Sequence, residues 1–403
     1  MILWLRCRSH EIPPGDDDST SLQNVAVAMA SWSWDRVVAR RLRRSHLLGQ
    51  RHDQPPDVVR SVCGVQAQVP AAAELSIGVR AGRLTRADLR KVVNEERALI
   101  RTHAMRNTAH LLPTDDLPLY LAAMRQLHGG EGRWFNAFGL DSSRADELFA
   151  TIREALDHRR LTRQELAAAL RGRLGGWVFE LFDPLLAQLS VVAGYAGALA
   201  YGPSIGGRST FVRPDQWGRG SRWEEVEGET ALSELVCGFF AAYGPASHQD
   251  LARWLGVTGG QARRLVGAVT DRLVAVDVAG LPAWLPTDDV DADEATAHGV
   301  VRLLPQYDCY ILGSGPLEQV APPKATELVR RRKRGRYEGA AGVPVLLIDG
   351  VVAGVWERRE VGRHIRITVE PIRPLAPAER LELEVAAEAV AAFDEAIAET
   401  KVL

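Results

Sequence analysis

Two glutamines spaced two residues apart, Gln66 and Gln68, are the first candidates for chemistry in this sequence. In an extended segment this spacing places both amides on one side of the chain, whereas on a helix they would diverge by about 200°. Val69 precedes Pro70 and is therefore biased away from the helical region. We expect a helix that runs in from Pro56 to change to extended chain near Gln68. Neighbouring primary amides can read a base edge, orient a water or cap a loop, and the pair alone does not decide among these.

The sequence lacks the better-known motifs of metal, nucleotide and serine-nucleophile sites. The sequence contains no HExxH, GxxxxGK[ST] or GxSxG, and its glycine-rich run at 202–207 lies in a predicted hairpin and not between a strand and a helix. His103 and His110 have no carboxylate at metal-ligand spacing, which favours structural or phosphate-adjacent roles. The scarcity of lysine argues against a Schiff-base mechanism. We therefore expect neither a metal nor a cofactor.

Length and composition limit the class of protein. The 403 residues are enough for about two to four domains with apolar cores. No apolar run of about 18 residues is present, so no membrane span is expected. Four widely separated cysteines form neither a CxxC pattern nor a disulfide framework, which fits a reducing cytoplasm.

The net charge is close to zero, but the positive charge is almost entirely on arginine. A net charge of −2 argues against a uniformly basic nucleic-acid binder. All but four of the 49 basic residues are arginines. Arginine suits bidentate contacts to phosphate and guanine, although such a bias also follows from genomic base composition.

The predicted elements repeat an order of helices followed by a hairpin, which is typical of winged-helix domains. In the first copy, helices are expected at 35–48, 56–67 and 71–80, with one opening at 84–89, and a hairpin at 99–112. The 35–48 helix is amphipathic, and its arginines are expected to face either solvent or phosphate. Thr85 and Asp88 predict a capping box, and Asp115 and Asp116 are expected to cap the helix after the hairpin.

The second and third copies follow. The second has helices at 142–159, from 161 and at 183–196, and hairpin strands at 197–202 and 209–213. The third has helices at 232–243, 245–256 and 261–273 and wing strands at 274–278 and 283–285. Ser247 and Asp250 predict a cap for its second helix, and Gly259 and Gly260 mark the turn of a helix-turn-helix.

The C-terminal part has a different pattern. Short strands are expected at 300–304, 307–312, 343–348, 351–357 and 365–369, with a closing helix at 376–400. A small β-barrel or a curled sheet packed on that helix is the predicted architecture. Between its strands lies the densest basic run of the chain, Arg330–Tyr337. It is interpreted as a phosphate contact, and the alternative is a disordered surface loop.

Residues 33 to 370 resemble the bacterial winged-helix DNA glycosylases of the AlkZ and YcaQ type. The segments that carry the resemblance are WDRVVARRLRRSHLL, CGVQAQ, ALIRTHAMRNTAHLLPTDDLPLY, LAYGPSIGGRSTFVRPDQW, the third helix-turn-helix, and RLLPQYDCYILG followed by LLIDGVVAGVW. No one segment is decisive, but their order and spacing together are specific. The resemblance implies an α+β, mainly α fold in which three tandem winged helices form a C-shaped DNA cleft beside a small β-barrel with a closing helix.

The domain boundaries expected on this basis cover nearly the whole chain. They are 1–30 for a disordered extension or misassigned start, 31–140, 141–226 and 227–290 for the winged helices, and 297–403 for the barrel and its helix.

The resemblance also implies an activity and its residues. The family excises N7-alkylated purines, in AlkZ-like members including bulky natural-product adducts and interstrand crosslinks, as monofunctional glycosylases. Its Gln-Φ-Gln signature matches Gln66-Ala67-Gln68, so Gln66 and Gln68 inherit the catalytic assignment. A DNA-probing hairpin of the family is placed near Arg330–Tyr337. The expected DNA contacts are Arg101, Arg106, His110, Arg331, Arg332, Lys333, Arg334 and Arg336.

The expected partner is double-stranded DNA that contains alkylated purines, bound by a cytoplasmic monomer without an obligate protein partner. His103 and Asn107 depart from the aromatic residue and glycine of the family hairpin, and Gly313–Pro316 stands where relatives carry an Asp-Arg pair. These departures concern the range of adducts and the hairpin geometry more than the reaction. The alternatives are a non-catalytic winged-helix DNA-binding protein, either a regulator or a shield, and a protein-binding scaffold.

Overall fold

The computed structural model describes residues 29–49, 54–129, 135–136, 139–174, 186–218, 223–290, 297–332 and 341–403. These residues form sheets of six, five and three strands together with helices, which confirms the predicted α+β class. None of the described helices is both long and apolar enough to cross a bilayer.

Two of the four N-terminal helices, the first and the last, begin at side-chain caps. The four helices are α1 (Trp34–Arg44), α2 (Pro55–Ser61), α3 (Pro70–Gly78) and α4 (Arg86–Lys91). Ser33 accepts from the Arg36 backbone N–H at 3.3 Å and starts α1. Thr85 and Asp88 form the predicted capping box of α4.

Two arginines of α1 contradict the expectation that this helix turns its arginines to solvent or phosphate. Arg40 and Arg41 are only 4% and 2% exposed. Arg40 pairs with Asp289 near the end of the third predicted unit. Arg41 donates to three backbone carbonyls, those of Tyr243 at 2.8 Å, Pro245 at 2.5 Å and Gly315 at 2.6 Å. A buried guanidinium needs such acceptors for its N–H groups, so these arginines attach α1 to distant segments of the chain.

The predicted helix at 56–67 is too long. Helix α2 ends at Ser61, and strand β2 (Val65–Gln66) follows after a short turn. Cys63 and Gly64 in that turn have φ values of +53° and +91°, which a right-handed helix cannot accommodate.

The first two predicted hairpins are confirmed but join into a single sheet. Its strands are β2, β3 (Leu99–His103), β4 (Ala109–Pro113), β5 (Leu161–Thr162), β6 (Ala200–Ile205) and β7 (Arg208–Val212), in the order β2-β4-β3-β6-β7-β5. The two hairpins meet through one antiparallel pair, Arg101 with Tyr201. The second unit is therefore fixed directly to the first.

Helices α7 (Arg163–Leu174) and α9 (Leu186–Tyr195) pack on this sheet, α6 (Ser142–Ala155) packs on α7, and α5 (Leu117–Leu127) packs on α9. The Thr162 backbone N–H donates to Glu165 at 2.7 Å, as the sequence predicts for the start of α7. Helix α6 ends four residues earlier than expected. The predicted cap of α5 is wrong, because Asp116 makes no side-chain cap and accepts from Arg60 Nε at 2.8 Å instead.

The third unit has the predicted order with shifted bounds. Its elements are α10 (Gly228–Tyr243), α11 (His248–Leu255), α12 (Gly259–Gly267), β8 (Leu273–Val278) and β9 (Leu281–Pro286). The Ser247–Asp250 capping box of α11 is confirmed. Thr258 caps α12, so Gly259 and Gly260 belong to its first turn and not to the preceding turn. Strand β1 (Ala30–Trp32), which was not predicted, pairs in parallel with β8.

The C-terminal sheet is a half-barrel, which lies between the two predicted forms, a small β-barrel and a curled sheet. Its strands are β10 (Val301–Leu304), β11 (Val345–Ile348), β12 (Val351–Val361), β13 (His364–Pro371) and β14 (Ile397–Val402), hydrogen-bonded in that order. Helices α13 (Cys309–Gly313), α14 (Leu317–Val320), α15 (Pro323–Arg332) and α16 (Pro377–Phe393) accompany it. The predicted strand at 307–312 is wrong because Asp308 caps α13, and the closing helix ends at Phe393 because β14 follows.

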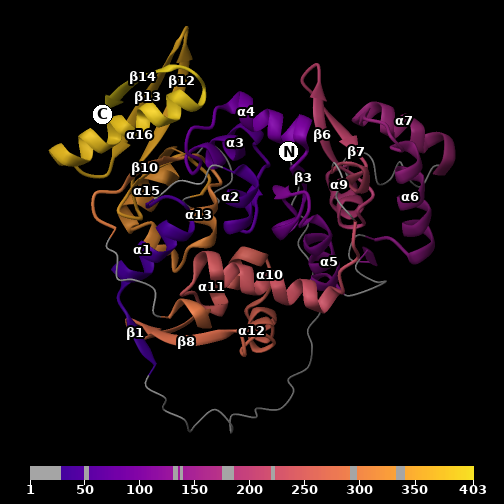
Figure 1. The fold of residues 1–403 in the computed structure, drawn as a ribbon, viewed down its shortest axis with the longest axis horizontal. Coiled ribbons are helices and arrows are strands. Elements are labelled where there is room, and N and C mark those ends of the chain that lie inside the picture. Colours follow the sequence, from indigo (N-terminus) through magenta and orange to yellow (C-terminus); the bar gives the residue numbers. More distant parts are fainter. Residues whose placement is uncertain are drawn as a thin grey trace.

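Figure 1 shows the half-barrel with α16 at one end of the molecule and β6–β7 with α6 and α7 at the other, while α2, α3 and α4 lie between them. The N-terminal helices share one hydrophobic cluster with the half-barrel, and the first hairpin shares another with the second and third units. A fully buried ion pair, Arg80 Nη2 to Asp308 Oδ1 at 2.7 Å, also joins the segment after α3 to the cap of α13.

Candidate functional site

The turn into β2 determines where the two glutamines lie. Gly64 combines its positive φ with close packing, because a Cβ at this position would lie 2.7 Å from Leu112 Cδ2. Only glycine satisfies both conditions without strain. Gln66 then pairs with His110 of β4, and the Ala67 N–H donates to the Ala109 carbonyl at 2.6 Å, which keeps the chain extended.

The two amides meet on one side of this extended segment. Gln66 is 6% exposed, whereas Gln68 is exposed. Gln66 Nε2 donates to Gln68 Oε1 at 2.9 Å, which confirms that the spacing brings the side chains together. Val69 is extended and Pro70 begins α3. The buried Gln66 amide therefore holds the solvent-exposed Gln68 amide through a hydrogen bond.

Arg106 supplies the second polar contact of Gln66. Its Nη2 donates to Gln66 Oε1 at 2.9 Å, and its Nη1 donates to the carbonyl of Trp254 in α11. Burial lowers the pKa of Arg106 to about 10, so the guanidinium stays charged near neutral pH. Arg106 was expected to contact DNA, but both of its terminal nitrogens already donate to oxygen atoms of the protein.

The turn that carries Arg106 has an unusual backbone. Arg106 and Asn107 both have positive φ, at +57° and +56°. Asparagine tolerates this region better than most residues with a side chain, which explains how it stands where the family resemblance predicts glycine. The Tyr195 hydroxyl of α9 lies 2.8 Å from the Ala104 carbonyl and 2.7 Å from Asn107 Oδ1. The second unit therefore holds this turn in place.

His110, the cross-strand partner of Gln66, and His103 are both buried. His110 is 2% exposed, and its Nδ1 lies 2.9 Å from the Thr108 carbonyl. Burial lowers the pKa of His110 to about 3 and that of His103 to about 4. His110 consequently has no surface from which to contact DNA directly, and both rings are neutral at physiological pH.

These histidines predict acid sensitivity. Unfolded histidine titrates near pH 6.5, well above the pKa values of the two buried rings, so between these values the unfolded chain binds more protons than the folded protein. The free energy of unfolding should therefore decrease as the pH falls below about 6.5, by on the order of 2 kcal/mol for each histidine near pH 5. Urea unfolding near pH 7 and near pH 5 measures this decrease. His110→Asn, which keeps a donor for the Thr108 carbonyl, should reduce it, and a variant that left it unchanged would contradict the assignment; the exposed His298→Asn is the control.

Arg101 lies on the other face of the sheet from Gln66. It pairs with Leu111, whereas Gln66 pairs with His110, and neighbouring strand positions face opposite ways. Its guanidinium lies 4.2 Å from the centre of the Tyr201 ring. Both residues line a groove of about 450 Å³ that Ala67 and Pro70 also border. Arg101 therefore faces a cavity next to the glutamine segment but is separated from the amides.

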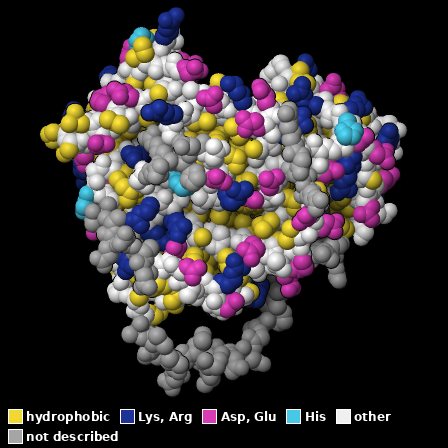
Figure 2. Space-filling model, viewed as in Figure 1, with side chains coloured by type: hydrophobic (Ala, Val, Ile, Leu, Met, Phe, Trp, Pro, Cys, Tyr) yellow, Lys and Arg dark blue, Asp and Glu magenta, His cyan; other side chains and the backbone are white. Residues whose placement is uncertain are grey.

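The basic run is only partly described. Arg331 and Arg332 are exposed at the end of α15, where both contact the carboxylate of Glu370. Helix α15 replaces the expected hairpin over these residues. Lys333, Arg334 and Arg336, and with them the rest of the proposed probing segment, lie outside the described residues. On the face in Figure 2, basic side chains are scattered among acidic ones and do not form one continuous stripe.

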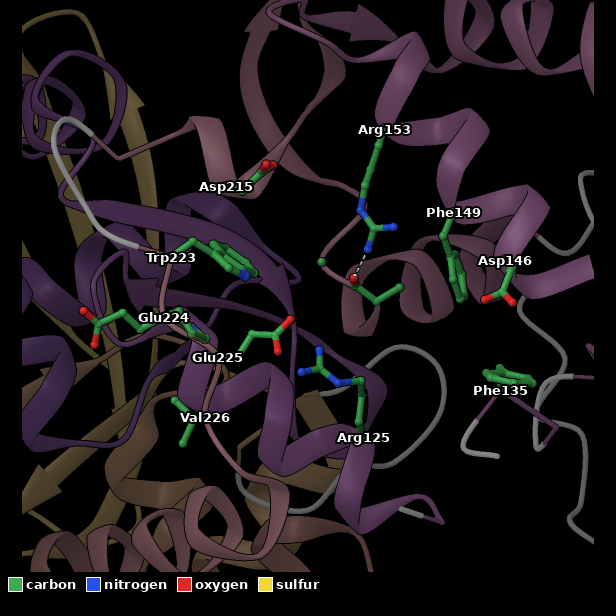
Figure 3. Close-up of a pocket in the computed structure, with 13 residues that line it drawn as sticks. Arg125, Phe135, Asp146, Phe149, Arg153, Asp215, Trp223, Glu224, Glu225 and Val226 are labelled. Carbon is green, nitrogen blue, oxygen red and sulfur yellow. Dashed lines mark hydrogen bonds between the residues drawn. The ribbon is translucent and has the colours of Figure 1, made fainter. Parts of the chain in front are cut away.

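Another cavity lies away from the glutamines. It measures about 600 Å³ and is lined by residues of α5, α6 and the segment before α10, including Trp223, Glu225 and Phe149 (Figure 3). Arg125 and Arg153 at this cavity donate to the carbonyls of Tyr195 at 2.8 Å and Ala196 at 2.6 Å. They satisfy the C-terminal end of α9, which is a structural role. None of the predicted site residues lines this cavity.

The described residues contain no group of three or more His, Cys, Asp and Glu side chains arranged to hold a metal ion. The sequence predicted that the two glutamine side chains lie together, but it did not predict that Arg106 contacts Gln66. The contact with the Trp254 carbonyl joins residues 148 positions apart, and no local signal predicts it. The nearest signal in the sequence is Gly256, a glycine of the kind that ends helices. It caps the C-terminus of α11 with a φ of +78° and lies beside Arg106.

Comparison with known proteins gives consistent results. The sequence model of the family described as DNA glycosylase AlkZ-like matches residues 59–393. The chain is 32% identical over 373 residues to an interstrand DNA cross-link repair glycosylase of Streptomyces sahachiroi, an alignment that covers 88% of this chain and 95% of the relative. The solved structure of the Streptomyces sahachiroi DNA glycosylase AlkZ is similar with a TM-score of 0.77 at 29% identity, over 93% of this chain and 100% of that chain.

Proposed function

The chain belongs to the AlkZ-like DNA glycosylase family and is a DNA glycosylase, and from this premise we propose that it hydrolyses the N-glycosidic bond of N7-alkylated purines in double-stranded DNA. The observation that carries the proposal is the hydrogen-bonded pair Gln66–Gln68 inside the region that matches the family. In the described part of the chain, neither amide hydrogen-bonds to a carboxylate. The site therefore suits a leaving group that needs no protonation.

The proposed chemistry follows from the charge of the substrate. Alkylation at N7 makes the purine cationic and weakens its bond to the sugar, so the base departs without a general acid. The remaining tasks are to stabilise an oxocarbenium-like sugar and to place a water. Gln68 Oε1 keeps a lone pair that can accept from this water, and the amide N–H groups can donate to O4′ or to a phosphate oxygen. Without a carboxylate base, excision of neutral bases should be slow.

We propose that the three units act as winged helices around a DNA cleft. The third unit, α10 to β9, has the order of a helix-turn-helix followed by a wing, with α12 as its recognition helix. Arg101, Arg331 and Arg332, together with Lys333, Arg334 and Arg336, are the proposed phosphate contacts. Arg106 and His110 are instead proposed to act from within the protein, because their polar groups face protein acceptors.

Bulky adducts and interstrand crosslinks are part of the proposal. The relative from Streptomyces sahachiroi is named an interstrand DNA cross-link repair glycosylase, which supports such substrates here. A base tethered to the opposite strand cannot rotate fully out of the duplex, so an open cleft suits it better than a deep pocket. We propose that the chain acts as a monomer on this DNA.

The test is a labelled duplex with a single N7-methylguanine. Incubation with the protein followed by alkali should cleave the strand at the lesion, and matched duplexes with uracil or hypoxanthine should remain largely intact. A crosslinked duplex should separate on a denaturing gel if unhooking occurs. The rival function, a non-catalytic DNA-binding protein, predicts salt-dependent binding without abasic sites on simple and bulky adducts alike, and that result would overturn the proposal.

A further inference from the structure

Arg106 has a fixed position between the two halves of the site. It lies in the turn between β3 and β4, with one nitrogen on the Trp254 carbonyl of the third unit and another on Gln66. Gly256 packs against it so closely that a Cβ there would lie 3.0 Å from Arg106 Cγ. The side chain therefore has little room to leave this arrangement.

A guanidinium can only donate hydrogen bonds, and this determines how both amides are oriented. The atom of Gln66 that faces Arg106 must be the oxygen, so Gln66 Nε2 must face Gln68. The atom of Gln68 that receives this N–H must then also be an oxygen. One donor-only group thus orients two amides in series, and Gln68 is left with its NH₂ group and one oxygen lone pair for substrate and water.

We infer that Arg106 is the positioning residue of the glycosylase site, and that it orients the Gln66 and Gln68 amides through a hydrogen-bond chain anchored on the third unit. The inference rests on the proposed catalytic role of the two glutamines. Without Arg106 either amide can turn over, which exchanges donor for acceptor at the position where water and sugar meet. The loss would appear in the chemical step and not in DNA binding.

A direct attraction between Arg106 and the substrate explains the residue less well. A cation beside the site opposes both a positively charged purine and an oxocarbenium-like sugar. A phosphate contact would have to use the same terminal nitrogens, each of which already donates one N–H to a protein oxygen, that of Trp254 or that of Gln66. Orientation of the amides accounts for both contacts.

The experiment compares Arg106→Lys and Arg106→Ala with the wild-type chain on the N7-methylguanine duplex under single-turnover conditions. Lysine keeps the charge but cannot hold two acceptors with a planar fork. Both variants should lower the rate at saturating enzyme by about 10- to 100-fold, the effect of losing a hydrogen bond from a charged group. The dissociation constant for the duplex and its dependence on salt should stay close to wild type.

Controls separate positioning from folding and from phosphate binding. Arg153→Ala removes another partly buried arginine that donates to a backbone carbonyl, and it should keep the wild-type rate. Guanidinium ion, well below denaturing concentrations, should restore part of the rate of Arg106→Ala, which a folding defect would not allow. A wild-type rate in Arg106→Lys overturns the inference. A second result would also overturn it: an unchanged rate at saturating enzyme, together with a slope of log binding constant against log salt concentration that is smaller by about one. That combination is the signature of a lost phosphate contact.

Failure of the proposed function has a different signature. A wild-type chain that leaves N7-methylguanine in place would overturn the glycosylase assignment for this substrate. An active wild-type chain with equally active Arg106 variants would overturn only the positioning role.

Discussion

Replacing Gln66 or Gln68 with alanine is expected to reduce the single-turnover rate of N7-methylguanine excision by roughly 10²- to 10³-fold. This is the usual effect of removing one preorganised polar group that acts on charge developing in the transition state. Gln66→Ala also removes the N–H that Gln68 Oε1 accepts at 2.9 Å, so both substitutions disturb the same pair. Alkali-dependent cleavage of the labelled duplex measures the rate.

Gln66→Glu tests the hydrogen bond between the two amides separately from the contact with Arg106. A carboxylate keeps an acceptor for Arg106 but cannot donate to Gln68, so the variant should fold and still lose activity. The exposed Gln164→Ala, which removes an amide that accepts from Arg208 at 3.3 Å, should leave the rate unchanged. Full activity in Gln66→Ala and Gln68→Ala, with abasic sites still formed, would show that the chemistry lies elsewhere.

The largest effect on stability is expected for Asp308→Ala. Both partners of the Arg80–Asp308 pair are 0% exposed, and two hydrogen bonds of 2.7 and 2.8 Å join them. Ser76 Oγ donates to the same carboxylate at 2.7 Å. Removing the carboxylate leaves a buried guanidinium without its counter-charge, which costs about 3–5 kcal/mol of unfolding free energy. Urea unfolding monitored by circular dichroism measures the loss.

Two comparisons show whether this loss comes from the unpaired charge. The double variant Arg80→Met, Asp308→Leu removes both charges and should be more stable than Asp308→Ala, since apolar side chains often replace a buried pair with little loss. Glu234→Ala breaks a half-exposed pair with Arg272 and should cost less than about 1 kcal/mol. If the double variant is no more stable than Asp308→Ala, the loss of unfolding free energy comes from altered packing and not from the unpaired charge.

Local signals in the sequence predicted local structure well. The capping boxes at Thr85 and Ser247 mark the starts of α4 and α11, because the bonds they form reach only three residues along the chain. The segment at 307–312 was misread because a short apolar run fits a buried strand as well as a helix. There Asp308 accepts from the Tyr310 N–H at 2.9 Å and starts α13.

Interactions between distant segments could not be predicted. The amide pair follows from a spacing of two residues, whereas the orientation of Gln66 depends on an arginine 40 positions away. The joining of two hairpins into one sheet depends on a single pair, Arg101 with Tyr201, in segments that each already form a complete hairpin. The burial of Arg40 and Arg41 depends on carbonyls that an amphipathic pattern does not reveal.

The buried arginines of α1 constrain the order in which a newly made chain can fold. Arg41 finds its acceptors 202, 204 and 274 positions later, so α1 is made long before anything that can receive its N–H groups exists. Until residues 243–245 have left the ribosome, the Arg41 guanidinium has none of these acceptors, and the third, Gly315, follows later still. A shortened chain that stopped after the first unit would face the same condition permanently. The final assembly of the N-terminal region is therefore expected only after most of the chain has been made.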